Sequence, residues 1–299
     1  MFCSTVWVLV TGKPFVIEWE KNNLPAILVQ WYAGEQAGNS IADILFGEVV
    51  PSGRLTFSFP RSTGHLPVYY NYLPSDRGFY KNPGSYDSPG RDYVFSAPSA
   101  LYSFGYGLSY TTFCLNTTAM WETEDQIFAE VQVTNTGNLA GKEVVQIYFE
   151  APQGLLKKPA RQLAAFAKTR LLQPGETQQI RLSFAKADMA SYDDLGKIKK
   201  SAYILEKGTY KFYIGTSVRD TKESLLTMEL YENMITKQLT AHLVPTSLKE
   251  RMLSDGSFEE LPQSACNDMN ECVFEKMEPG TEEGITPAVR CCARGTLFD

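Results

Sequence analysis

The first sixty residues alternate short apolar runs with polar or amphipathic segments. Residues 6–10 (VWVLV) and 26–32 (AILVQWY) are continuous apolar runs, a pattern typical of parallel strands that are buried on both faces. A polar link at 20–23 separates them, and the apolar positions of 37–45 follow the spacing of a helix. The alternating run at 55–59 predicts a further short strand.

The pattern changes character along the rest of the chain. Residues 69–112 interleave Tyr and Phe with Gly, Pro, Ser and Asp, which predicts an aromatic-rich interdomain loop region. Residues 113–217 contain five or more short alternating runs separated by Gly- or Pro-containing turns, as in a β-sandwich. Residues 218–299 are weakly patterned, with either a strand or a short helix expected at 225–234. The expected fold is α/β plus all-β: a partial doubly wound α/β sandwich in 1–68, a β-sandwich and a tail.

Composition restricts the class of protein. With 28 Lys plus Arg, 34 Asp plus Glu and 43% hydrophobic residues, the chain has neither the charge of a nucleic-acid binder nor the composition of a disordered protein. No apolar run reaches the length of a membrane span, and residues 1–10 lack the basic start and cleavage site of a signal peptide. Residues 250–299 contain 4 basic and 11 acidic side chains, so the net charge of −6 originates in the tail.

The tail also holds four of the six cysteines: Cys266, Cys272, Cys291 and Cys292. A bond between the adjacent Cys291 and Cys292 would be strained, so each is expected to join one of the other two, and either pairing is possible. Such disulfides predict an oxidising compartment, the secretory pathway or the extracellular space. Asn116 begins an Asn-Thr-Thr sequon and is a predicted glycosylation site.

Few residues of the sequence are candidates for a catalytic or binding role. Glu18 and Glu20, which flank Trp19, are the carboxylates best placed for a cleft, although ordinary surface charge explains them better. Trp19 and Trp31 are weak candidates for stacking on sugar rings, and the aromatic region suits interdomain packing more than a sugar-binding wall. The two histidines accompany no serine or cysteine motif, and the cysteines show no paired CxxC spacing. We therefore predict no catalytic triad, no metal site and no cofactor.

Several ordered motifs resemble the family 3 glycoside hydrolases. The motifs of the second, α/β-sandwich domain of that family are matched by LPAIL (24–28), WYAGEQAGN (31–39), IADILFGE (41–48) and PSGRL (51–55). The run LYSFGYGLSY (101–110) resembles the end of the loop that follows this domain. The segments 133–148 and 172–176 resemble the fibronectin type III-like domain of three-domain members.

The resemblance implies a retaining, exo-acting, β-glucosidase-like enzyme that hydrolyses O-glycosidic bonds in carbohydrate breakdown. In that family the nucleophilic Asp comes from an amino-terminal barrel and the acid/base Glu from a loop upstream of residue 1. This chain is therefore expected to be a scaffold that is inactive alone, with the barrel, the rest of the α/β domain and a β-glucoside or oligosaccharide as partners. The alternative is a non-catalytic carbohydrate-binding or adhesive module.

Within the resemblance, the residues of the turn at 51–54 are expected to be structural. Gly34 and Gly38 would allow close approach of the helix to the sheet, and Gly53 would permit the turn. Arg54 is expected either to fix this turn or to pair with Asp43, and no catalytic role is predicted for it.

Overall fold

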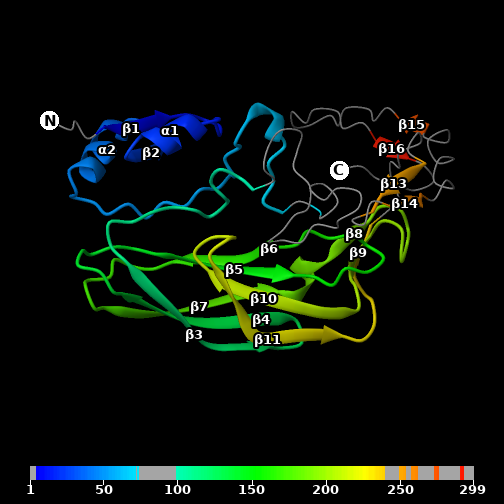
Figure 1. Cartoon of the computed structure of the whole chain (residues 1–299). Coiled ribbons are helices and arrows are strands. Elements are labelled where there is room, and N and C mark those ends of the chain that lie inside the picture. Colours follow the sequence, from blue (N-terminus) through cyan, green and yellow to red (C-terminus); the bar gives the residue numbers. More distant parts are fainter. Residues whose placement is uncertain are drawn as a thin grey trace, which may run out of the picture.

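The computed structural model describes residues 5–71, 73, 99–239, 249–253, 257–261, 273–275 and 290–292. A small α/β part lies along one side of a β-sandwich, and a hairpin lies near one end of that sandwich (Figure 1). The fold class expected from the sequence, α/β plus all-β, is confirmed.

The α/β part is a parallel two-stranded sheet with its crossover helix. Strands β1 (Val6–Val10) and β2 (Ala26–Gln30) pair in parallel, and they are connected through α1 (Glu18–Asn23). Helix α2 (Ala37–Leu45) follows β2, as predicted. The expected polar link at 20–23 is wrong, because these residues form most of α1, whose first turn carries two acidic side chains that suit the helix dipole.

The two strands are less buried than their composition predicts. Residues in β1 and β2 are exposed or half-buried, because the described sheet has two strands and one apolar cluster covers only one of its faces. The buried members of that cluster are Ile17, Phe59 and Leu101. The segment 55–59 is not the regular strand expected. The chain bends at 56–57, and only its two ends pair with 101–106. Leu55 N–H donates to the Tyr106 carbonyl (2.9 Å) and Phe59 N–H donates to the Tyr102 carbonyl (2.8 Å).

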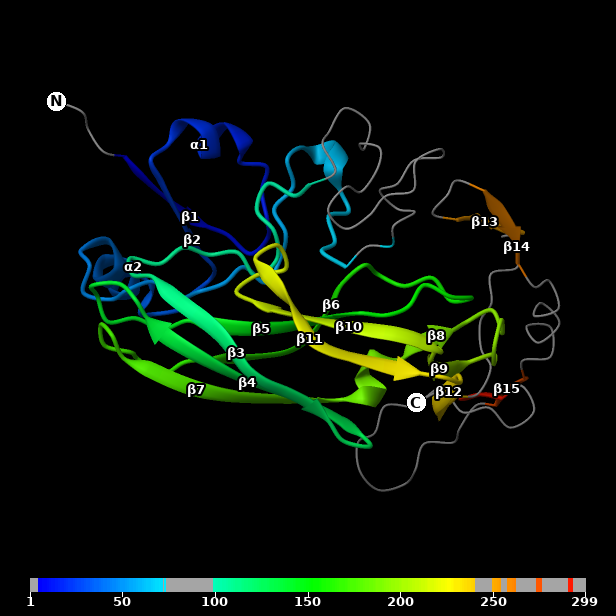
Figure 2. The same cartoon turned by 60° about the horizontal axis from the view of Figure 1, so that its bottom comes forward.

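The sandwich consists of two antiparallel sheets packed face to face (Figure 2). The three-stranded sheet has the order β3–β4–β7, with β3 (Phe113–Glu122), β4 (Gln126–Asn135) and β7 (Thr177–Ala185). The four-stranded sheet has the order β11–β10–β5–β6, with β11 (Thr221–Leu230), β10 (Gly208–Gly215), β5 (Val144–Glu150) and β6 (Gln162–Lys168).

Period-two alternation explains why these segments are strands. In β4 the side chains of Ile127, Ala129, Val131 and Val133 are fully buried, while the residues between them point away from the core. Strand β7 alternates in register with β4, and the main core lies between the two sheets. This interleaving is the arrangement expected of a sandwich of the fibronectin type III kind.

The sandwich continues past residue 217. Strand β11 pairs with β10 as far as Leu230, beyond the residue at which the sequence placed the boundary. The sequence left this element open between a strand and a short helix at 225–234, because most of its side chains are not buried. A register shift between Lys211 and Tyr213 interrupts its pairing with β10.

The remaining elements are short. A third sheet has the order β12–β9–β8 and contains β8 (Ser191–Asp193), β9 (Ala202–Leu205) and β12 (Met234–Gln238). Two antiparallel pairs follow, β13 (Glu250–Met252) with β14 (Phe258–Glu260) and β15 (Val273–Glu275) with β16 (Arg290–Cys292). Short 3-10 helices span Thr63–His65 and Lys186–Met189.

The tail lies largely outside the described residues. Cys266, Cys272 and the side chains of Cys291 and Cys292 are among the parts that are not described, so the disulfides stay a prediction. Cys114 is a free, exposed thiol on β3. No helix within the described ranges is long and apolar enough to cross a membrane.

Two buried tyrosines of β10 make the sandwich sensitive to alkaline pH. The Tyr210 hydroxyl donates to the Glu206 carbonyl (3.0 Å) and the Tyr213 hydroxyl donates to Glu150 Oε2 (2.8 Å). Burial raises the pKa of both from 10.0 to about 12. The unfolded chain therefore releases these protons at lower pH than the folded protein does, so stabilisation present below pH 10 is lost as the pH rises toward 12.

We expect urea midpoints to fall between pH 10 and pH 12 and to fall less steeply in Tyr210→Phe. Tyr192→Phe, at a more exposed position, is the matched control and should leave the slope unchanged. A midpoint that stays constant across this range in the unsubstituted protein would contradict the expectation.

Candidate functional site

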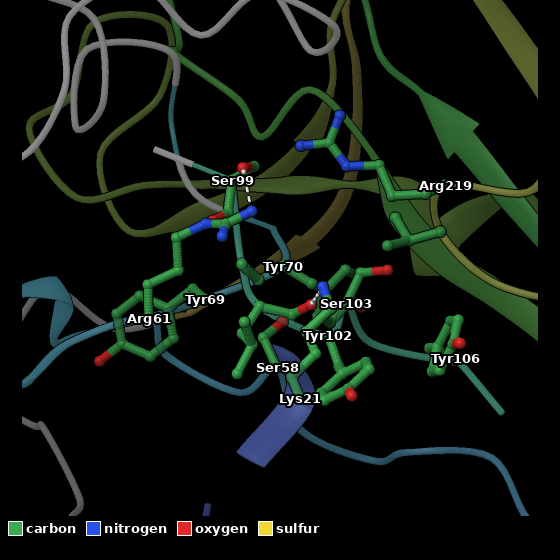
Figure 3. Close-up of a pocket in the computed structure, with 13 residues that line it drawn as sticks. Lys21, Ser58, Arg61, Tyr69, Tyr70, Ser99, Tyr102, Ser103, Tyr106 and Arg219 are labelled. Atoms are coloured by element: carbon green, nitrogen blue, oxygen red, sulfur yellow. Dashed lines mark hydrogen bonds between the residues drawn. The ribbon is translucent and has the colours of Figure 1, made fainter. Parts of the chain in front are cut away.

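A pocket of about 390 Å³ lies at the junction of the α/β part and the sandwich (Figure 3). Its wall combines residues of α1, of the segments around 58–61 and 99–106, and of the turn after β10. The side chains most relevant to its chemistry are Lys21, Arg61, Tyr69, Tyr102, Tyr106 and Arg219, and Ser58, Ser99 and Ser103 add hydroxyls. No carboxylate is among the described residues that line it.

Arg61 is held in place by three hydrogen bonds. Its Nε donates to the Ser99 carbonyl (2.8 Å), one terminal nitrogen donates to the Ser99 hydroxyl (3.2 Å), and the other donates to Glu18 Oε1 (3.0 Å). These contacts come from two segments, 38 and 43 residues away along the chain. The guanidinium is therefore oriented at the pocket wall by the tertiary structure.

Lys21 reaches the pocket from α1. Its Nζ donates to the Leu101 carbonyl (3.1 Å) and lies 4.9 Å from the centre of the Tyr102 ring. Tyr102 in turn faces Tyr106 at 5.2 Å, and burial, with a smaller contribution from Tyr106, raises the pKa of Tyr102. The Tyr102 hydroxyl is therefore a neutral hydrogen-bonding group at physiological pH.

The described aromatic residues of 69–112 include a clear packing contact. Tyr70 stacks on Phe104 with ring centres 4.2 Å apart, and it meets Tyr148 of the sandwich edge to face. The Leu163 N–H donates to the Tyr70 hydroxyl (3.3 Å), and burial raises the pKa of Tyr70. Tyr70 and Phe104 therefore pack between the α/β part and the sandwich, whereas Tyr69 is 62% exposed at the pocket.

The structure does not bring the four weak candidates together. Trp31 packs near Phe59 in the apolar cluster, whereas Trp19 is 66% exposed on α1. Glu18 and Glu20 lie two positions apart on a helix and not on a strand, so they do not share one face. Only Glu18 touches the pocket wall, through its ion pair with Arg61.

Asn116, the predicted glycosylation site, is exposed on strand β3, which forms an edge of the three-stranded sheet. Within the described part of the chain, no group of three His, Cys, Asp or Glu residues is placed to hold a metal ion.

The Arg54 side chain connects the α/β part to the sandwich and does not pair with helix α2. It donates one hydrogen bond to Glu143 and another to the Gly107 carbonyl, so the predicted pair with Asp43 is wrong. The reason is spatial: the turn at 51–54 packs against the loop that precedes the sandwich, where a Cβ on Gly107 would collide with the Gly53 carbonyl. The expected close approach at Gly38 is not seen, because no described atom lies within 4 Å of an added Cβ there.

Two family models match the chain in the same order as its two domains. The glycosyl hydrolase family 3 C-terminal domain matches residues 2–110, and the fibronectin type III-like domain matches residues 143–218. The chain belongs to glycosyl hydrolase family 3. It comprises sequence of the carboxy-terminal domain of this family followed by the fibronectin-like module, as the motifs predicted.

Individual relatives of this family 3 chain are β-glucosidases. Beta-glucosidase A of Butyrivibrio fibrisolvens is 43% identical over 99% of this chain and 39% of the relative. The periplasmic beta-glucosidase of Salmonella typhimurium is 36% identical over 73% of this chain and 28% of its own length. The crystal structure of a Paenibacillus barengoltzii β-glucosidase is 32% identical, with a TM-score of 0.71, over 94% of this chain and 33% of that one. The chain spans well under half of each.

The described wall of the pocket in this family 3 chain does not contain the pair of groups that a retaining glycosidase uses. Retaining hydrolysis uses two carboxyl groups about 5 Å apart, and the described wall offers cations, phenols and hydroxyls instead. The sequence reasoning missed Lys21, Arg61 and Arg219 because they are far apart along the chain. The aromatic density of 69–112 was the one available signal for this region.

Proposed function

We propose that this chain is the carboxy-terminal scaffold of a retaining, exo-acting, β-glucosidase-like enzyme of carbohydrate breakdown, and that it is inactive alone. The observation that carries the proposal is the pocket wall, whose described residues include no carboxylate in a chain that belongs to a glycoside hydrolase family. Both catalytic carboxylates then come from a part of the enzyme outside residues 1–299. The substrate class follows the names of the relatives, which are β-glucosidases.

The scaffold role is supported by the contacts between the two domains. Arg54 bridges Gly107 and Glu143, and Tyr70 stacks between Phe104 and the sandwich. Gly105 allows a close approach to the sandwich, since a Cβ there would lie 2.9 Å from Ser217 Cα. A sandwich fixed in this way would hold the α/β domain, and any active-site loops attached to it, in one orientation.

The proposal includes a compartment outside the cytoplasm. One of the relatives is named a periplasmic enzyme, and the four clustered tail cysteines suit an oxidising environment.

The test compares the chain with a chimaera. The purified chain should not hydrolyse 4-nitrophenyl β-D-glucoside, because the described wall of its pocket offers no facing pair of carboxylates. A chimaera in which this chain replaces the matching 39% of Beta-glucosidase A of B. fibrisolvens should hydrolyse the same substrate. The release of 4-nitrophenol measures hydrolysis by the chain alone and by the chimaera. A parallel assay with the corresponding β-xyloside shows which of the two sugars the chimaera hydrolyses.

Hydrolysis by the chain alone that is abolished by Glu18→Gln or Glu20→Gln, but not by the matched exposed control Glu229→Gln, would overturn the proposal. A folded chimaera with no activity would count against the scaffold role. Circular dichroism and thermal melting verify that the chimaera is folded.

A further inference from the structure

We propose that the outer face of the three-stranded sheet β3–β4–β7 binds a neutral β-1,4-glucan chain. The four-stranded sheet meets the α/β part, since Tyr148 of β5 and Tyr213 of β10 pack in one cluster with Tyr70 and Phe104. The outer face of the three-stranded sheet therefore lies on the opposite side of the sandwich from the α/β part (Figure 1). The choice of β-linked glucose rests on the proposed β-glucosidase function, whereas binding at this face needs no hydrolysis.

An aromatic pair lies at one end of this face. Trp121 of β3 and Phe128 of β4 stand opposite each other in the strand register, with ring centres 5.3 Å apart and ring planes within 9° of parallel. The guanidinium carbon of Arg181 on β7 lies 5.0 Å from the centre of each ring. Both rings are half-buried, so part of each ring is open to a ligand. Aromatic rings of this kind pack against the apolar C–H faces of sugar rings.

Polar side chains continue along the strands from the aromatic pair. Gln132 and Gln179 stand opposite each other and are both exposed. Gln179 Nε2 donates to Glu130 Oε2 (2.7 Å), which orients its amide. The next row contains Thr134 and Thr177, whose hydroxyl oxygens lie 2.8 Å apart. Amides and hydroxyls both donate and accept hydrogen bonds, as the hydroxyls of a neutral sugar do.

The charges in the row between the aromatic pair and the amides are balanced. Glu130 and Arg181 stand opposite each other in the register, so a carboxylate and a guanidinium share this row. A neutral chain can use both groups, because sugar hydroxyls donate to a carboxylate and accept from a guanidinium. The face therefore combines apolar contact with hydrogen-bonding groups of both kinds, which is the complement of a neutral saccharide.

The length and shape of the face indicate the kind of saccharide. At about 3.4 Å per residue, the four steps along β4 from Phe128 to Gln132 cover about 13 Å. A ligand that touches both the rings and the amides must therefore be an oligosaccharide of several units. A β-1,4-glucan is an extended ribbon with equatorial hydroxyls and apolar ring faces, and it can lie along an open sheet face. An α-1,4-glucan coils and presents a different shape.

The test is calorimetric titration of the whole chain with cellohexaose, and with maltohexaose and D-glucose for comparison. We expect cellohexaose to bind at least about tenfold more tightly than either of the other two sugars. Trp121→Ala should weaken cellohexaose binding by about tenfold, because it removes one of the two rings of the aromatic pair. Trp19→Ala is the matched control and should bind normally, since Trp19 is 66% exposed on α1 and lies outside the face.

A second pair of variants tests the amides. The double variant Gln132→Ala with Gln179→Ala should weaken cellohexaose binding by about fivefold or more, through the loss of hydrogen bonds to sugar hydroxyls. Gln173→Ala, at an exposed position before β7, is its control. Asn116 stands next to Gln132 in the same row and is the predicted glycosylation site. The protein is therefore produced in the cytoplasm of a bacterial host, where it carries no N-linked glycan.

Tryptophan fluorescence separates the loss of the site from the loss of the fold. Trp121→Phe keeps an aromatic ring, so it should retain most of the affinity but lose most of the change in emission on addition of cellohexaose. The other three of the four tryptophans lie in the α/β part. Thermal melting shows whether each variant is folded.

Three results would each overturn the proposal: no binding at millimolar cellohexaose, equal affinity for cellohexaose and maltohexaose, or full affinity in folded Trp121→Ala. Loss of binding in Trp19→Ala but not in Trp121→Ala would place the sugar on α1 and would also overturn it. Because every readout is binding, these outcomes are independent of whether the chimaera hydrolyses a glucoside.

Discussion

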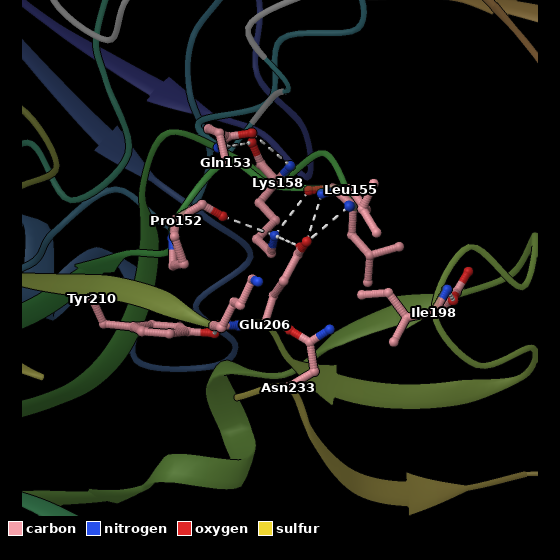
Figure 4. Close-up of polar contacts among 11 residues, drawn as sticks. Pro152, Gln153, Leu155, Lys158, Ile198, Glu206, Tyr210 and Asn233 are labelled. Carbon is pink, nitrogen blue, oxygen red and sulfur yellow. Dashed lines mark hydrogen bonds and ion pairs between the residues drawn. The ribbon is translucent and has the colours of Figure 1, made fainter. Parts of the chain in front are cut away.

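Replacing Glu206 with alanine is expected to lower the free energy of unfolding of the sandwich by about 3–5 kcal/mol. Glu206 Oε2 lies 2.5 Å from Lys158 Nζ, and the two side chains are 5% and 1% exposed (Figure 4). The carboxylate also accepts the Leu155 N–H (2.5 Å) and the Leu156 N–H (3.2 Å). The substitution therefore removes the counter-ion of a buried ammonium and the acceptor of two backbone N–H groups.

The ammonium makes this loss larger than that of an ordinary hydrogen bond. Lys158 Nζ also donates to the Pro152 and Leu156 carbonyls, both at 2.8 Å, so it is the centre of the loop at 152–158. Burial lowers the pKa of Lys158, and the Glu206 carboxylate acts in the opposite direction. Without that carboxylate the charged form of Lys158 is destabilised further, and the loop loses its attachment to the strand end at residue 206.

Denaturant unfolding of Glu206→Ala measures the effect. Glu223→Ala is the matched control, because its pair with Lys211 is half-exposed, spans 3.5 Å and should contribute less than about 1 kcal/mol. The double variant Lys158→Met with Glu206→Leu should recover most of the stability, since it removes both buried charges. A loss in Glu206→Ala no larger than that in Glu223→Ala would contradict the expectation.

Arg54→Ala is expected to lower the free energy of unfolding by about 2–3 kcal/mol, the range for charged hydrogen bonds. The Arg54 guanidinium is largely buried and donates to the Gly107 carbonyl and to Glu143. Glu143 itself accepts the Val144 N–H (2.6 Å) at the start of β5. Removing Arg54 leaves this buried carboxylate without its cation, at the position where the α/β part meets the sandwich.

Because Arg54 links two domains, its loss should also change cooperativity. We expect calorimetry to resolve a separate, earlier transition of the α/β part in Arg54→Ala, and limited proteolysis to begin there. Asp43→Ala and Arg170→Ala are the controls, since neither removes an interdomain contact in the described structure. If Asp43→Ala destabilised the chain as much as Arg54→Ala, the pairing seen in the structure would not be the one that matters in solution.

The local pattern of apolar and polar residues was sufficient to predict most helices and strands of the fold. Strands β1, β2 and β4 and helix α2 were predicted because the periodicity of their own residues determines which face of each element is apolar. Strand β11 was predicted only as a strand or a short helix at 225–234, because its alternation of inward and outward side chains is short, and its pairing with β10 decides that it is a strand. The identity of α1 was also missed, because its short polar sequence reads equally well as a loop.

The sequence by itself determined the family, the order of the two domains and most of the strands, because these depend on local periodicity and on contiguous motifs. Only the tertiary structure decided the partner of Arg54, which lies 89 residues away in the chain, and the meeting of Lys21, Arg61 and Arg219 in one pocket. Charged side chains have no periodic signature, and their partners are set by how distant segments pack. The chemistry of the site therefore became visible only when the α/β part was placed against the sandwich.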